Sequence, residues 1–275
     1  PPMNNWISAV TPVLSPRRAL LLLAALLITA CATSPLGRSQ LILFPESEMA
    51  QMGAAAFQNI QQETPVTSEA RVNGYVTCVS EHILRAMGER PSDWEIKVFD
   101  NEAANAFALP GRKIGVYTGL LDVAENQGQL ATVIGHEIAH VQAKHSNERV
   151  STNFVTQSGL QLAQVVVGAD TPMKQQLLGL LGVGAQYGVV LPFSRTQEAE
   201  ADLIGLELMA QAGFDPRESV KLWQNMQAAG GERPPEFMST HPSSERRITE
   251  LNARMREYLQ ISTQARAAGR NPDCR

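Results

Sequence analysis

Hydrophobic residues recur at helical spacing along most of this chain. Between residues 47 and 62 they lie on one face of a helix, and the pattern returns between residues 68 and 87, where Gly88 marks a stop. The apolar run over residues 129–144 also has the length and composition of a helix. Further helices are predicted over residues 150–168, 172–190, 195–212, 215–229 and 242–259.

Three short stretches fit strands better than helices. Residues 94–98 alternate between polar and apolar side chains, and residues 103–109 and 113–117 flank a Pro110-Gly111 turn. Few strands beside many helices predict an α+β fold that is mainly helical and contains a small β-sheet.

The apolar segment from Leu177 to Pro192 contains glycine at positions 179, 182, 184 and 188. Glycine lowers the stability of a helix, so we expect weak order here. The segment is either a helix packed closely against its neighbours or a mobile loop. The functional alternatives are a lid over a cleft and a patch that contacts lipid.

The strongest chemical signal is the pentad His136-Glu137-Ile138-Ala139-His140. Positions i and i+4 share a helix face, so His136 and His140 can hold one metal ion while Glu137 reaches a metal-bound water. This is the zinc metallopeptidase arrangement of two histidine ligands and a general base. The alternative is an amphipathic helix with two satisfied histidines, but a glutamate on a largely buried helix is costly unless it has a role.

A catalytic zinc ion usually takes three protein ligands, so a third must be found. His145 is nearest in sequence, but a continuing helix would turn it away from the pair, and we expect a surface residue at a helix end. Glu198 and Asp202 share a face of a later helix. Glu198 can ligate zinc, and Asp202 can accept a hydrogen bond from a ligand histidine. The alternative is a solvated acidic face, and the pattern alone leaves both open.

Four separated segments resemble one family in both order and spacing. They are similar to the HtpX-like and CAAX-prenyl-protease-like zinc metallopeptidases, and most of all to the soluble periplasmic lipoprotein branch without helical repeats. The resemblance spans about residues 40–260. The segments are Asn105 to Gly111, the pentad, Ser194 to Asp202 with Gly205, and Ser239-Thr240-His241-Pro242 followed by Arg247-Ile248.

The resemblance implies a zincin-like fold and a ligand set. His136, His140 and Glu198 would hold one Zn²⁺ per chain. Glu137 would be the general base, taking a proton from zinc-bound water and passing it to the leaving amine.

The resemblance also implies roles for two residues near the C-terminus. His241 would stabilise the oxyanion, or swing in as a fourth ligand and block the water site. Arg247 would hold the oxyanion or position His241. Without the family, His241 is a helix-entry residue before Pro242 and Arg247 a surface arginine.

The segment Asn105-Ala106-Phe107 lies within the predicted strand before the Pro-Gly turn. In zincins an edge strand beside the metal binds substrate by taking the peptide as a further strand, held through main-chain hydrogen bonds. We therefore expect Asn105, Ala106 and Phe107 to bind substrate at a sheet edge that borders the active site. The alternative is a plain structural hairpin.

The N-terminus has the pattern of a bacterial lipoprotein signal. Arg17-Arg18 precede the uncharged apolar stretch 19–30, which is too short for a convincing transmembrane helix. Ile28-Thr29-Ala30-Cys31 resembles a lipobox, so we expect cleavage before Cys31 and lipidation there; the alternative is an ordinary signal peptide. The expected organisation is a signal peptide over 1–30, a lipidated linker over 31–45, a metallopeptidase domain over 46–265 and a tail over 266–275.

Two cysteines remain once Cys31 is set aside. An oxidising periplasm would permit a disulfide between Cys78 and Cys274, and two free thiols are the alternative. The formal net charge is −4, and about −6 without residues 1–30. No basic patch points to nucleic acid.

These features predict a zinc endopeptidase that cleaves unfolded or misassembled envelope proteins. It would be lipid-anchored in the periplasm, on the outer membrane of a Gram-negative bacterium, where outer-membrane assembly machinery is a possible partner. The alternatives are a zinc-binding chaperone or assembly factor for outer-membrane proteins with latched or negligible proteolysis, and a metal-free scaffold.

Overall fold

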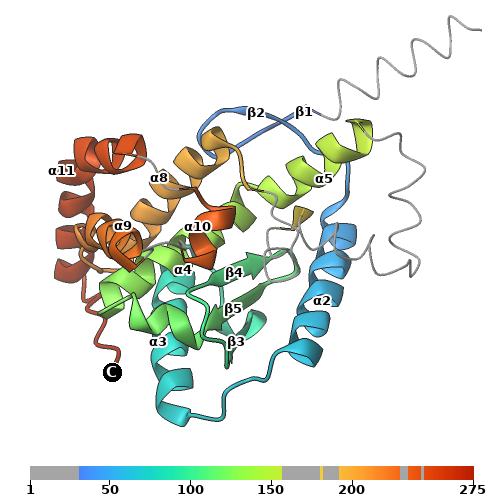
Figure 1. Ribbon diagram of the computed structural model, residues 1–275. Coiled ribbons are helices and arrows are strands. Elements are labelled where there is room, and N and C mark those ends of the chain that lie inside the picture. The colour runs from blue at the N-terminus through green and yellow to red at the C-terminus, as the bar shows by residue number, and fades with distance from the viewer. Residues whose placement is uncertain (1–30, 157–179, 182–191, 230–234, 243–244) are drawn as a thin grey trace, which may run out of the picture.

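The computed structural model describes residues 31–156, 180–181, 192–229, 235–242 and 245–275, and Figure 1 shows helices around a small sheet. The expected α+β, mainly helical fold is confirmed. Within the described residues, no helix is long and apolar enough to cross a membrane. Among the described residues, the helices of eight or more residues are α2 (Glu46–Glu63), α3 (Ala70–Ala86), α4 (Gln127–Gln142), α5 (His145–Thr156), α8 (Arg195–Gln211), α9 (Glu218–Ala229) and α11 (Glu245–Ala267).

The three predicted strands form one sheet in the order β3-β5-β4. Strand β5 (Lys113–Tyr117) lies in the middle, parallel to β3 (Glu95–Phe99) and antiparallel to β4 (Ala106–Leu109). Strand β4 begins later than expected, because Asn101 accepts a hydrogen bond from the Ala103 amide and the chain bends there. The edge strand β4 packs against α4.

A close crossing of α4 and α8 forms the centre of the fold. It depends on one glycine from each helix. A Cβ atom on Gly135 would lie 2.9 Å from the carbonyl oxygen of Gly205, and one on Gly205 would lie 2.7 Å from the amide nitrogen of His136. Because neither glycine has a side chain, the backbones of α4 and α8 can approach closely, and the functional side chains of the two helices come into contact.

Two apolar clusters hold the elements in place. The larger joins α3, α4, α8, α9 and α11, with Trp223 and Phe214 among its fully buried side chains. The smaller packs α2 against the outer face of the sheet through the aromatic rings of Phe57, Phe99 and Phe107. Together they bury both faces of the sheet.

Residues 31–45, expected to be a linker, instead contain a β-hairpin. Strands β1 (Cys31–Thr33) and β2 (Ser39–Leu41) pair antiparallel and lie beside α5 and α8 (Figure 1). The Gln40 side chain donates to the carbonyl of Ala143 at 2.7 Å. Strands of three residues carry too little alternation to be predicted from sequence.

Other differences concern the later helices. Helix α5 begins at His145, five residues before the predicted start, and the single turn α10 (Glu236–Thr240) was not predicted. The 3₁₀ turns Pro91–Asp93 and Thr118–Asp122 flank β3 and β5. Three predictions lie wholly or largely outside the described residues: the signal peptide over 1–30, the helix over 172–190 and the weak order over 177–192, of which residues 180, 181 and 192 are described. The predicted helix over 150–168 is described only as far as residue 156.

Candidate metal centre

Helix α4 places the pentad in the middle of the protein. Asn126 starts the helix by accepting hydrogen bonds from the amides of Gly128 and Gln129 at 2.9 and 3.1 Å. The helix is then buried from Gly128 through His140. One turn apart, His136 and His140 bring their Nε2 atoms to 3.0 Å from each other.

Helix α8 brings a carboxylate to this pair. Ser194 and Gln197 form a capping box that begins the helix, so that Glu198 lies in its first turn. Glu198 Oε1 lies 3.4 Å from His140 Nε2, and Oε2 lies 3.6 Å from His136 Nε2. The acidic pair is therefore buried against the pentad, and the solvated-face alternative is wrong.

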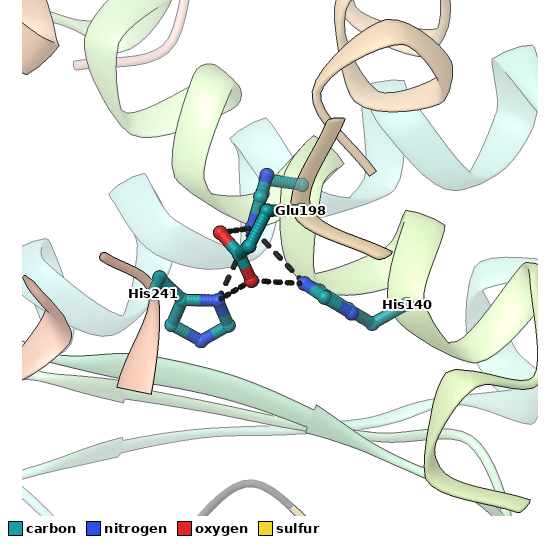
Figure 2. Close-up of side chains that lie close together, drawn as sticks. His140, Glu198 and His241 are labelled. Carbon is teal, nitrogen blue, oxygen red and sulfur yellow. Dashed lines mark hydrogen bonds and ion pairs between the residues drawn. The ribbon is translucent and has the colours of Figure 1, made fainter. Parts of the chain in front are cut away.

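A third imidazole completes the cluster from the end of α10. His241 Nδ1 lies 3.0 Å from Glu198 Oε1 and 3.2 Å from His136 Nε2 (Figure 2). Its ring is stacked between Phe237 and Phe193, with centroid separations of 4.4 and 5.2 Å. His241 is thus held among the ligand atoms, which is the fourth-ligand position and not a helix-entry position.

The cluster has the chemistry of a zinc site. Three imidazole nitrogens and a carboxylate oxygen lie within 4.8 Å of one another, and all four residues are buried. Such N and O donors in a set of four suit Zn²⁺. In addition, the buried Oε1 of Glu137 makes no hydrogen bond. A cation at this point would neutralise the carboxylates and separate nitrogens that otherwise face one another.

Burial and neighbouring charges separate the pKa values of these groups. Burial lowers the pKa of His140 well below its usual value, which favours the neutral, ligating form. For Glu198 burial acts upward, but the imidazoles of His241, His140 and His136 bring its pKa well below the usual range. Burial raises the pKa of Glu137, as is typical of a carboxylate that serves as a base.

Glu137 lies between the cluster and the sheet. Its Oε2 accepts a hydrogen bond from the Ala108 amide of β4 at 3.3 Å, and its Oε1 lies 3.4 Å from His241 Nε2. The carboxylate therefore faces both the metal donors and the edge strand.

Asp202 and Arg247 contact the ligand side chains from outside the cluster of ligand atoms. His136 Nδ1 lies 3.1 Å from Asp202 Oδ1, and the Arg247 guanidinium binds both Asp202 oxygens at 2.6 Å. Arg247 also lies 2.7 Å from Glu198 Oε2 and donates to the carbonyl of Pro242 at 3.0 Å. Of the two expected roles of Arg247, this geometry favours positioning over oxyanion binding, and Arg247 is buried, not at the surface.

The edge of β4 is already hydrogen-bonded within the protein. The Tyr117 amide donates to the Asn105 carbonyl, so the backbone groups of Asn105 and Phe107 face β5, and those of Ala106 and Ala108 face outward. The Ala106 amide donates to the Asn105 side chain at 2.9 Å. The ring of Phe107 lies in the smaller core. The outward backbone groups of this strand therefore belong to Ala106 and Ala108 and not to Phe107, and both outward amides are already bound by side chains.

The expectation that His145 lies at the surface was wrong, although His145 does stand at a helix end, as the first residue of α5. His145 is fully buried, its Nδ1 lies 2.9 Å from Nδ1 of His140, and its Nε2 lies 3.2 Å from Oε2 of Glu200. The prediction assumed an uninterrupted helix. Instead, Lys144 has φ of 55°, so α4 ends, the chain turns and His145 points back at the ligand. Sequence reasoning also missed Glu200, because a residue two positions after Glu198 lies on another side of the helix and carries no signal of burial.

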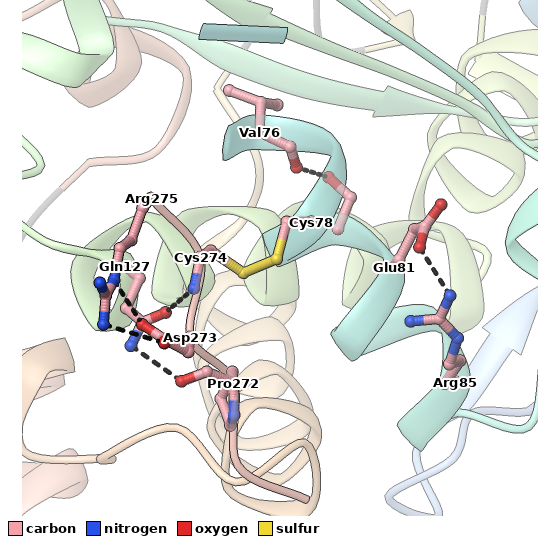
Figure 3. Close-up of a disulfide and its surroundings, with 10 residues drawn as sticks. Val76, Cys78, Glu81, Arg85, Gln127, Pro272, Asp273, Cys274 and Arg275 are labelled. Carbon is pink, nitrogen blue, oxygen red and sulfur yellow. Dashed lines mark hydrogen bonds and ion pairs between the residues drawn. A yellow bond between two sulfur atoms is a disulfide. The ribbon is translucent and has the colours of Figure 1, made fainter. Parts of the chain in front are cut away.

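Cys78 of α3 and Cys274 of the tail form a disulfide with an S–S distance of 2.04 Å (Figure 3). The tail is also held by Gln127, which donates to the Pro272 carbonyl and accepts from the Cys274 amide. The linked residues are 196 positions apart. On the loop-entropy model, a closure of that length stabilises the fold by about 5 kcal/mol.

These features define a metallopeptidase: a buried two-histidine, one-glutamate site with a neighbouring base, built on crossed helices beside a sheet edge. The family model of peptidase family M48 matches residues 70–255. The chain belongs to peptidase family M48, whose members are zinc-dependent.

Named relatives agree with this assignment. The chain is 38% identical over 179 residues to mitochondrial metalloendopeptidase OMA1 of Schizosaccharomyces pombe, covering 64% of this chain and 51% of that one. It is 31% identical over 258 residues to the OMA1 of Bos taurus, covering 88% and 49%. It is 24% identical over 222 residues to the beta-barrel assembly-enhancing protease of Escherichia coli, covering 78% and 45%. The chain spans about half the length of these relatives.

Proposed function

We propose that the protein is a zinc-dependent endopeptidase that cleaves unfolded or misassembled proteins of the cell envelope. The observation that carries the proposal is the buried cluster of His136, His140 and Glu198, with the Glu137 carboxylate placed between it and the outer edge of β4. Zn²⁺ held by these donors would lower the pKa of a water molecule and polarise the scissile carbonyl group.

The chain's own groups account for the proton transfers. Glu137 takes the proton of the attacking water on its carboxylate and passes it to the leaving amine. Its raised pKa, caused by burial, suits both the acceptance and the release of that proton. Asp202 accepts from Nδ1 of His136 and so keeps Nε2 of that ring directed at the metal donors.

The outward groups of Ala106 and Ala108 are the proposed substrate contacts. An extended peptide added along β4 would run past Glu137, and main-chain pairing would select for extended chains with little regard to sequence. In the present structure the Ala106 and Ala108 amides bind Asn105 and Glu137. Addition of a peptide therefore requires that the Asn105 and Glu137 side chains give up these hydrogen bonds.

The cellular setting belongs to the same proposal. A signal segment over residues 1–30 and a lipid on Cys31 would anchor the enzyme in the periplasm at the outer membrane. The similarity to the Escherichia coli protease supports a link to outer-membrane assembly. The disulfide between Cys78 and Cys274 suits an oxidising compartment.

One observation favours the alternative of a zinc-bound chaperone or assembly factor. His241 occupies the fourth position of the cluster, where a bound water would otherwise lie. A permanently held His241 would give a zinc protein with negligible proteolysis. A His241 that moves away gives an enzyme with a latch, which is the form we propose.

Substrate conformation provides the test of this proposal. Reduced and alkylated ribonuclease A, which is unfolded, is expected to be cleaved, whereas native ribonuclease A is expected to stay intact in the same incubation. Gel electrophoresis and mass spectrometry of the fragments measure both. Equal cleavage of the two forms, or cleavage of the native form only, would contradict a preference for unfolded chains.

A further inference from the structure

A line of hydrogen bonds, buried from His140 as far as Glu200, runs outward to the half-buried Arg38 of the hairpin over residues 31–41. His140 directs Nε2 to the metal donors, and its Nδ1 contacts His145 Nδ1 at 2.9 Å. His145 Nε2 contacts Glu200 Oε2 at 3.2 Å. The same Glu200 oxygen accepts from Nε of Arg38, the residue before β2, at 3.0 Å.

The proton positions along this line follow from the ligand. With Nε2 of His140 turned to a metal ion, its Nδ1 must carry the proton and donate it to His145. His145, as a neutral imidazole that accepts at Nδ1, then holds its own proton on Nε2 and donates to Glu200. Every contact in the line thereby has one donor and one acceptor.

The two pentad histidines are supported in parallel ways. His136 donates directly to Asp202, whose oxygens are bound by Arg247. His140 reaches its carboxylate, Glu200, through His145, and that carboxylate is bound by Arg38. Each ligand imidazole is therefore linked by hydrogen bonds to a carboxylate, and each carboxylate forms an ion pair with an arginine.

Further contacts hold the hairpin over residues 31–41 where Arg38 can reach Glu200. Arg38 also binds Glu148 of α5, with its Nη2 2.7 Å from Glu148 Oε2, and Gln40 binds the carbonyl of Ala143 at the end of α4. His145 is fully buried, and Glu200 is only 5% exposed. The match to the family model begins at residue 70, so it leaves the hairpin out.

We propose that His145, Glu200 and Arg38 are positioning residues of the metal centre. They fix the tautomer and the ring orientation of His140, and the hairpin over residues 31–41 is thereby a structural part of the site. The inference rests on the proposed function, because it takes His140 as a zinc ligand.

Metal affinity of the purified full chain tests the inference. The readouts are the zinc dissociation constant, from competition with a chromophoric chelator, and the visible spectrum of the Co²⁺-substituted protein. His145→Leu removes both hydrogen bonds, and we expect zinc affinity to fall about 10- to 100-fold, the usual effect of losing a partner of a ligand histidine. The Co²⁺ spectrum should change as well, since the ligand field follows the orientation of His140.

Two milder variants guard against a folding defect. Glu200→Gln keeps the shape and one acceptor but loses the charge that faces Arg38, and Arg38→Met removes that cation. Both should weaken zinc binding less than His145→Leu does. Arg85→Met, which breaks an exposed ion pair on α3 with Glu81, is the matched control and should bind zinc as the parent does.

The outcomes separate the inference from the proposed function. If the parent binds zinc and His145→Leu and Glu200→Gln bind it within about twofold of the parent, the inference fails while the zinc site stands. If Arg38→Met equals Arg85→Met, the hairpin is no part of the site. If His145→Leu does not fold, the other two variants decide. A folded parent without zinc affinity would overturn the proposed function itself.

Discussion

The Glu137→Gln variant is expected to bind zinc as tightly as the parent and to lose cleavage by about 10²- to 10⁴-fold, the usual contribution of a general base. The amide is nearly isosteric with the carboxylate, and its oxygen can still accept from the Ala108 amide. It cannot take up the proton of the attacking water. The ligands His136, His140 and Glu198 are unchanged, so the zinc content should remain.

The measurement is the rate of casein cleavage beside the zinc content of each sample. Glu81→Gln, on the exposed face of α3, removes a carboxylate away from the site and should leave the rate unchanged. Cleavage by Glu137→Gln at the parent's rate would show that another group accepts the proton.

The second large effect is expected from replacing His241, which should raise the rate of cleavage. In the structure His241 Nδ1 lies 3.0 Å from Glu198 and 3.2 Å from His136, within the donor cluster. A latch in this position reduces the fraction of molecules that can cleave substrate. Each 1.4 kcal/mol by which the latched state is stabilised lowers that fraction about tenfold. We therefore expect His241→Ala to raise casein cleavage about tenfold or more.

The ring of His241 also packs between Phe237 and Phe193, so its loss could loosen the site. His241→Leu fills most of that space without a donor atom and should raise cleavage in the same way. Thermal unfolding of both variants checks that the fold is retained. A fall in cleavage in both folded variants would contradict the latch and favour a role of His241 at the oxyanion.

The spacing of residues along the sequence predicted much of the metal centre. Helical spacing placed His136 and His140 on one face, and the spacing of Glu198 and Asp202 placed both on a second helix. Residue spacing gave no reason to bring those helices into contact. That reason lies in Gly135 and Gly205, because each helix lacks a side chain where the other crosses it.

The parts that sequence reasoning missed depend on single backbone angles and on long-range contacts. The turn at Lys144, with φ of 55°, reverses the direction of His145, and helical periodicity cannot anticipate it. Arg38 and Glu200 are 162 positions apart, and Arg38 stands in no recognisable motif, so the sequence does not link the two. His241 was identified only by resemblance to the family motif, since one histidine before a proline carries no periodic signal.

Removal and return of metal is the most direct test of the central claim, that the cluster of His136, His140 and Glu198 holds the zinc ion required for proteolysis. The purified protein should contain one zinc per chain, lose casein cleavage when a chelator removes it, and regain cleavage when Zn²⁺ is restored. A folded protein without zinc, or cleavage that persists after the zinc is gone, would contradict the account.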